Sequence, residues 1–308
     1  MTIFNGQTKR GGEGMKIGLH DADDTKFPNL ALMKLSAWHK KNGNSVSIYD
    51  PYKPYDLIYS SKVFTYTDIT PPYGSIYGGT GYDSPMVLPD ECEHIMPDYS
   101  LYDCKQSYGF LTRGCIRKCK HCVVPEKEGN IRANADIEEF LSHKECILMD
   151  NNVLAHHHGI EQIEKIATIG VKVDFNQGLD ARLIDNSIAK KLSKIKWLHP
   201  VRLACDSQSD MKKLHTAVEL LRWHNVTPKK YFVYMIVEDV EESMDRAKFI
   251  KGLYCDPWAQ PFRDPKTNKE PTDEQKDFSR WVNFGRIFNK IEWKYYKKRQ
   301  PKQEMTDA

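Results

Sequence analysis

The sequence predicts an α/β protein in which a small domain of parallel strands precedes an open, partial (β/α)6 barrel. Three observations lead to this fold class. Short apolar runs typical of buried strands alternate with amphipathic segments typical of helices. The alternation becomes regular after residue 107 and repeats six times by residue 262. Helical segments between the strands favour parallel pairing, because each crossover brings the chain back to the same end of the sheet.

The small domain is expected over residues 15–83 and is Rossmann-like in its order of elements. One helix is expected over 29–43, because its apolar residues fall on one helical face and Gly43 suits the position after a helix end. The expected strands of this domain are residues 15–19, 45–50, 56–64 and 75–83, the last of which runs into a glycine turn.

The barrel follows the same logic with greater regularity. Its expected strands are residues 107–114, 145–152, 171–178, 200–207, 230–238 and 252–262. Its expected helices are residues 136–143, 158–168, 186–195, 210–224 and 241–251. In parallel barrels of the TIM type the active site lies at the carboxyl ends of the strands, so residues at those ends are the first candidates for function.

The remaining boundaries follow from composition. The expected organisation is a flexible extension over 1–14, the small domain over 15–83, a linker over 84–106, the barrel over 107–262 and a tail over 263–308. The linker carries three prolines and little periodicity. The tail is expected to be a loop over 263–278 and then a helix over 280–303 whose apolar stripe begins at Trp281.

Charge and hydropathy exclude some classes of protein. The chain of 308 residues has no apolar run of the length that spans a membrane, and its first residues lack the apolar segment of a secretory signal, so we expect a cytoplasmic protein without a membrane partner. A net charge of +3 argues against a nucleic-acid surface over the whole chain. The basic residues near the end, Lys294, Lys297, Lys298 and Arg299, leave a nucleic-acid substrate open.

Three of the eight cysteines crowd into one short segment. Cys115, Cys119 and Cys122 have the spacing C-x3-C-x2-C, with basic residues between them. Three thiolates in one loop can hold three irons of a [4Fe–4S] cluster and leave the fourth iron open to a small molecule. The other five cysteines are scattered and are expected to be small buried residues, so one cluster is predicted. The alternative is a structural zinc site with Cys104 or His121 as fourth ligand, in a nucleic-acid-binding protein without catalysis.

The segment TRGCIRKCKHC resembles the cluster motif of the radical S-adenosylmethionine (SAM) superfamily. The resemblance implies a partial (β/α)6 barrel in which SAM binds the open iron and is cleaved to methionine and a 5′-deoxyadenosyl radical. It also implies an external one-electron reductant of the flavodoxin or ferredoxin type. The substrate can be RNA or a nucleotide, a peptide or a small metabolite. His121 stands where this superfamily often places a residue beside the adenine.

Polar residues at the predicted strand ends are candidates for binding SAM. Asp150 and Asn152 end the second strand and offer oxygen acceptors for the SAM ammonium group, where the superfamily commonly has a polar motif. A turn that caps the strand is the alternative for Asp150. Gln177 ends the third strand and can hydrogen-bond the ribose or the carboxylate of SAM.

Two further candidates follow the third and fourth strands. Arg182 can pair with the SAM carboxylate or, alternatively, with Asp180 in a local ion pair. Asp206 lies at the end of the fourth strand. Tyr234 and Glu238 on the fifth strand are weaker candidates and are assigned to the substrate.

The small domain resembles a degenerate cobalamin-binding domain. The Asp-x-His-x-x-Gly loop of that family would fall near residues 20–24, where the sequence reads HDADD and the loop is missing. No histidine is therefore placed to be the lower cobalt ligand, and we expect the domain not to bind cobalamin.

Overall fold

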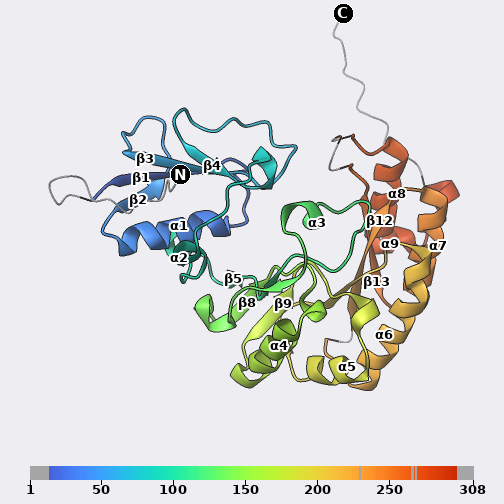
Figure 1. Ribbon diagram of the computed structural model, residues 1–308. Helices are drawn as coiled ribbons and strands as arrows, with labels where there is room; N and C mark the ends of the chain where they lie inside the picture. The colour runs from blue at the N-terminus through green and yellow to red at the C-terminus, as the bar shows by residue number, and fades with distance from the viewer. Residues whose placement is uncertain (1–13, 229, 265–266, 268, 297–308) are drawn as a thin grey trace, which may run out of the picture. The chain divides into compact units, whose positions relative to one another are not determined.

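The computed structural model describes residues 14–228, 230–264, 267 and 269–296. The chain divides into two compact units. The first runs to Gln177 and includes residues 195–199, and the second contains Gly178–Lys194 and the chain from Pro200 onward. Parallel strands alternate with helices in both units (Figure 1), which confirms an α/β fold with parallel sheets.

The first sheet has the strand order β2-β1-β3-β4, and all neighbours pair in parallel. Its strands are β1 (Lys16–Asp21), β2 (Ser45–Ile48), β3 (Leu57–Ser61) and β4 (Ile76–Gly78). Helix α1 (Leu30–Lys41) buries Leu32 and Leu35 in the core formed with β1. The Asn29 side chain caps its start, and Gly43 follows its end at φ +76°, a conformation that glycine adopts without strain.

Residues 84–106 are more than a linker. They contain the short helix α2 (Asp90–Glu93) and a 3-10 turn at Tyr99–Tyr102. Cys92 is fully buried in the core of the first sheet, and Lys34 of α1 forms an ion pair of 2.7 Å with Glu93. This segment therefore packs on the first sheet and its helix α1 as part of the same core.

The second sheet of the first unit has the order β10-β9-β8-β5 and is also parallel. Its strands are β5 (Ser107–Gly109), β8 (Glu145–Leu148), β9 (Lys172–Phe175) and the unexpected β10 (Lys196–Trp197). Helix α4 (His157–Ile169) follows β8 and buries Ile163 and Ile166, as its sequence pattern predicts.

Two expectations for this region are wrong. The predicted strand over 107–114 is two strands, because the chain leaves β5 and then forms β6 (Thr112–Arg113), which pairs in antiparallel fashion with β7 (Arg132–Ala133). The predicted helix over 136–143 is one 3-10 turn, Ile137–Glu139. It ends early because the Ser107 hydroxyl accepts the backbone N–H groups of Ser142 and His143, which ties the chain to β5.

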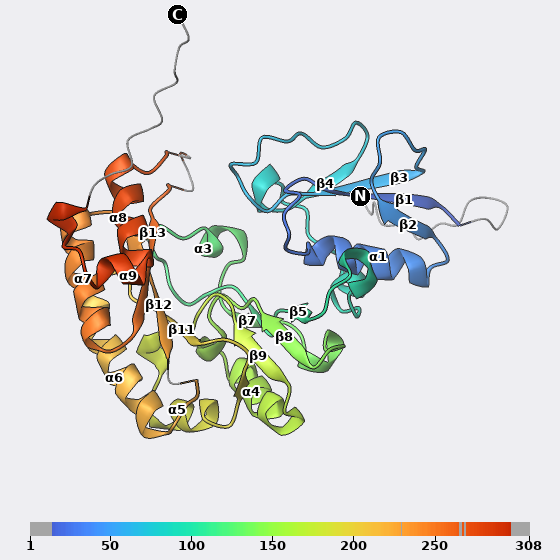
Figure 2. The same cartoon turned by 180° about the vertical axis from the view of Figure 1, so that it is seen from behind.

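The second unit holds a parallel sheet in the order β11-β12-β13. Its strands are β11 (Val201–Ala204), β12 (Tyr231–Val237) and β13 (Asp256–Pro261), and its helices are α5 (Asn186–Leu192), α6 (Met211–Trp223), α7 (Val240–Gly252), α8 (Asp273–Asn283) and α9 (Gly285–Phe288). Along β12 the odd-numbered residues are buried and the even-numbered ones are half-buried, so one face of the sheet is closed by packing. Figure 2 shows α6 and α7 beside this sheet.

The tail differs from its prediction. Helix α8 begins at Asp273, inside the stretch expected to be a loop, because Thr272 and Gln275 form a capping box. It ends at Asn283, whose side chain hydrogen-bonds the backbone of Ala259. Trp281 is buried, but Phe284 and Ile291 are exposed, so no continuous apolar stripe forms. Lys297, Lys298 and Arg299 lie outside the described residues.

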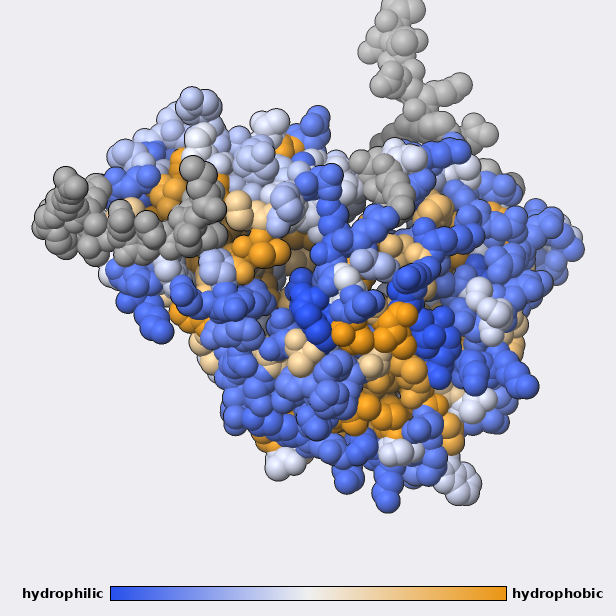
Figure 3. Space-filling view, viewed as in Figure 1, coloured by the Kyte–Doolittle hydropathy of each residue, from blue (hydrophilic) through white to orange (hydrophobic). Residues whose placement is uncertain are grey.

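Among the residues that the structure describes, no helix combines the length and the apolar character needed to cross a bilayer. The face drawn in Figure 3 is largely hydrophilic and is interrupted by separate apolar patches.

Candidate functional site

The three clustered cysteines lie in a loop whose two ends are joined. Strands β6 and β7 pair Thr112 with Ala133 and Arg113 with Arg132. Beyond this pairing, the backbone N–H of Cys115 donates to the carbonyl oxygen of Gly129 over 3.2 Å. We call residues 114–131 the cysteine loop. Because the two ends of the loop are joined at its base, the position of Cys115 just after β6 is fixed.

Glu128 reinforces this base from within the loop. It follows the short helix α3 (Val124–Lys127) and accepts hydrogen bonds from the Gly114 backbone N–H at 2.9 Å and from the Asn151 amide at 3.0 Å. Its other oxygen lies 3.0 Å from a guanidinium nitrogen of Arg113. That guanidinium also stacks on the Phe110 ring, 4.0 Å from the ring centroid. Sequence reasoning missed Glu128, since a single glutamate after the motif carries no distinctive spacing.

Gly114 is required by the close approach of two backbone segments. It adopts φ +80°, and a Cβ atom built on it would lie 2.3 Å from the carbonyl oxygen of Asn130. A side chain here would therefore push the two ends of the loop apart. Gly129 has a similar φ of +75° but no atom within 4 Å of its Cβ position.

These two glycines offer a matched test. Gly114→Ala should lower the free energy of unfolding by about 2–3 kcal/mol, because left-handed strain and a backbone clash act together. Gly129→Ala should cost about 1 kcal/mol, from the strain alone. Urea unfolding of both variants measures the difference, and equal losses would mean that the contact with Asn130 contributes nothing.

Asp150 anchors the strand that leads into the cysteine loop. Its carboxylate accepts the backbone N–H groups of Leu111 and Thr112, at 3.3 and 2.6 Å, and the Thr112 hydroxyl at 2.8 Å. Burial raises the pKa of this carboxyl to about 6, although the hydrogen bonds from Thr112 and Leu111 oppose the increase. Both oxygens of this carboxylate, which the sequence predicts to face the SAM ammonium group, accept hydrogen bonds from Leu111 and Thr112.

Asn152 reaches the loop at a cysteine. The residue is 3% exposed, and its amide nitrogen lies 3.6 Å from the sulfur of Cys115. The backbone N–H of Arg117 donates to the same sulfur over 3.3 Å. The sulfur of Cys115 therefore accepts two N–H donors, one from the loop backbone and one from a side chain after β8.

Burial separates the clustered cysteines from the others. Cys115, Cys119 and Cys122 are half-buried, as is Cys104, whereas Cys92, Cys146, Cys205 and Cys255 are buried. Cys146 lies within β8, whereas Cys205 directly follows β11 and Cys255 directly precedes β13. Burial raises the pKa of Cys255 to about 11 and that of Cys205 to about 12, so these thiols stay neutral at ordinary pH.

The three cysteine side chains do not form a preassembled metal site. Among the described residues, no group of three or more histidine, cysteine, aspartate or glutamate side chains is arranged to hold a metal ion. All three thiols belong to one loop whose ends are anchored. His121, in the same loop, is half-buried.

The other predicted site residues have varied surroundings. Gln177 is exposed at the end of the first unit. In the second unit the Arg182 guanidinium lies 2.7 Å from Asp180 and 3.4 Å from Asp210, which is the local ion pair named as its alternative. Asp206 accepts the backbone N–H of Ile236 over 3.1 Å. The Tyr234 hydroxyl accepts a hydrogen bond from the Arg202 guanidinium at 3.1 Å.

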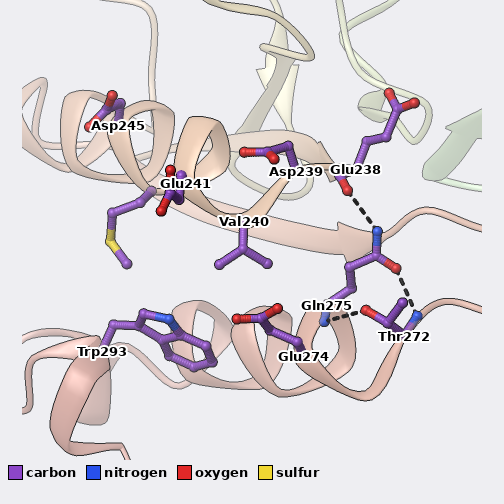
Figure 4. A pocket seen from close by; sticks show the side chains of 10 residues that line it. Glu238, Asp239, Val240, Glu241, Asp245, Thr272, Glu274, Gln275 and Trp293 are labelled. Carbon is purple, nitrogen blue, oxygen red and sulfur yellow. Dashed lines mark hydrogen bonds between the residues drawn. The ribbon is translucent and has the colours of Figure 1, made fainter.

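Glu238 lines a cavity of about 680 Å³ in the second unit. The cavity lies between the start of α7 and the start of α8, and Figure 4 shows Trp293 on the side opposite Thr272 and Gln275. Five carboxylate side chains line it: Glu238, Asp239, Glu241, Asp245 and Glu274. This negative charge suits a cationic group and opposes the phosphates of a nucleic acid.

The cysteine loop is the part of the chain with the clearest chemistry. It carries three half-buried thiols, and its base is held by Glu128 and Asp150. The sulfur of Cys115 accepts one N–H from Arg117 within the loop and one from Asn152 outside it. Such a loop can bind a thiolate-ligated metal centre. Comparison of the chain with models of known protein families and with curated proteins finds no match, so its function has to be argued from this loop.

Proposed function

We propose that the chain is a radical SAM enzyme with one [4Fe–4S] cluster bound by Cys115, Cys119 and Cys122. The observation that carries the proposal is the anchored C-x3-C-x2-C loop, in which the sulfur of Cys115 accepts two N–H donors. The alternation of strands and helices over 107–262 supports the partial barrel that the superfamily uses.

The donor set fits an iron–sulfur cluster better than zinc. Structural zinc sites are closed by four ligands, usually from two separate pairs. The cysteine loop contains three thiols within eight residues and a single C-x2-C pair, Cys119 and Cys122. Three thiolates are a complete protein ligand set for a cluster whose fourth iron binds a small molecule.

The residues of the chain then have separable tasks. Cys115, Cys119 and Cys122 would hold the cluster, which would supply the one-electron reduction needed to cleave SAM to methionine and a 5′-deoxyadenosyl radical. Glu128 and Asp150 hold the base of the loop, and the basic residues between the cysteines offset negative charge. His121 and Gln177, which keep exposed surface, are proposed to contact SAM. An external flavodoxin-type or ferredoxin-type protein supplies the electron.

Anaerobic reconstitution with iron and sulfide tests this function. The protein should turn brown, hold about four irons per chain and release 5′-deoxyadenosine from SAM when dithionite is added. Cys104→Ala is the matched control, because Cys104 is half-buried like the motif cysteines but lies outside the motif. The control should keep its iron. A protein that instead retains one zinc per chain, and loses it in the Cys104 variant, would support the zinc-stabilised alternative.

A further inference from the structure

Three consecutive residues after β8 each bind a different part of the cysteine loop region. Asp150 accepts hydrogen bonds from Leu111 and Thr112, which precede the loop. Asn151 donates to Glu128, near the end of the loop. Asn152 donates to the sulfur of Cys115, at the first ligand position. Asp150 thus fixes the backbone before Cys115, and Asn151 holds the Glu128 carboxylate that bonds the backbone of Gly114. These two contacts hold the third, from Asn152, in place.

The burial of Asn152 makes this contact specific. The residue is 3% exposed, and its backbone carbonyl accepts the N–H of Ala155 over 3.0 Å in the turn that precedes α4. Water therefore competes little for its amide N–H, and an electrostatic interaction at this depth is stronger than at the surface. The amide nitrogen, and not an acceptor oxygen, faces the sulfur. That orientation suits a negatively charged partner.

We propose that Asn152 is a positioning residue that raises the reduction potential of the cluster by donating its amide N–H to the Cys115 sulfur. This inference rests on the proposed function. Reduction adds one electron, taken from an external reductant, and increases the negative charge on the cluster and its sulfur ligands. A fixed N–H donor stabilises that charge more in the reduced form than in the oxidised form. Asn152 therefore makes the electron transfer to the cluster easier.

The test is a redox titration of the reconstituted cluster, followed by electron paramagnetic resonance. Asn152→Leu keeps the approximate size of the side chain and removes the N–H donor. At a fixed potential, its ratio of oxidised to reduced cluster should rise about tenfold, which is 59 mV for a one-electron couple. Asn152→Asp replaces the donor by a negative carboxylate and should shift the midpoint further in the same direction. Asn151→Leu is the matched control, because it removes an amide that bonds Glu128 and not sulfur; its midpoint should be that of the parent.

The outcomes separate this inference from the proposed function. A parent protein that binds no cluster contradicts the function itself. A parent with a cluster, and Asn152 variants whose midpoint is unchanged, would overturn only the role of Asn152. Equal shifts in the Asn151 and Asn152 variants would also overturn it, because the effect would then come from a loosened loop. So would loss of the cluster from both Asn152 variants, since Asn152 would then be needed for assembly and not for tuning.

Discussion

Replacement of Cys119 by Ala should abolish both cluster assembly and SAM cleavage. With one thiolate removed, the loop offers two cysteine ligands for a cluster that needs three. Iron and sulfide per chain after anaerobic reconstitution should fall to background, and so should the release of 5′-deoxyadenosine. Cys115→Ala and Cys122→Ala should behave in the same way.

The control for this prediction is a buried cysteine. Cys92 is 0% exposed in the core of the first sheet, and burial raises its pKa to about 12, so it is a poor metal ligand. Cys92→Ala should keep about four irons per chain. Cys255→Ala is a second control of the same kind. If the Cys92 variant lost the cluster as completely as the Cys119 variant, the assignment of three ligands in one loop would be wrong.

The elements that the sequence predicts well are those whose local pattern and tertiary packing agree. Helices α4, α6 and α7 bury the faces that their periodicity marks, and β12 alternates between buried and half-buried residues. The failures lie where side chains from distant segments intervene. Ser107 stops the helix expected from residue 136, and Asp150 draws Leu111 and Thr112 out of the strand expected over 107–114.

In the candidate site, too, local sequence pattern predicts some features, and contacts between distant segments decide the others. The cysteine spacing marks the ligand loop because all three residues lie within a few positions of one another. The pattern also marks Asp150 and Asn152 as polar residues at a strand end. Their partners, however, are distant in the sequence: Asp150 binds Thr112, 38 residues away, and Asn152 binds Cys115, 37 residues away. Periodicity and spacing carry no information about such contacts. Glu128 was missed for the same reason.

Removal of the Asp150 carboxylate should destabilise the first unit strongly. In Asp150→Ala the backbone N–H groups of Leu111 and Thr112 and the Thr112 hydroxyl lose their acceptor in a buried place, where each unsatisfied group costs about 1–3 kcal/mol. Part of this loss is offset because the buried charge is also removed. The expected loss in the free energy of unfolding is about 3–5 kcal/mol. Urea unfolding followed by circular dichroism measures it.

Asp150→Asn is the matched variant and also tests the charge. It keeps one acceptor oxygen and should lose about 1–2 kcal/mol at pH 7, above the pKa of the folded carboxyl. The pKa of Asp150 is raised to about 6 in the folded chain, so between its ordinary value near 4 and pH 6 the folded state holds more protons than the unfolded state. The contribution of Asp150 to stability therefore falls as pH rises through this window, by about 2–3 kcal/mol. The Asn variant lacks the titrating group, so the gap between it and the parent should narrow from pH 4 to pH 6. A constant gap would mean that the Asp150 carboxyl is not titrating in this window and that its anchoring role does not depend on charge.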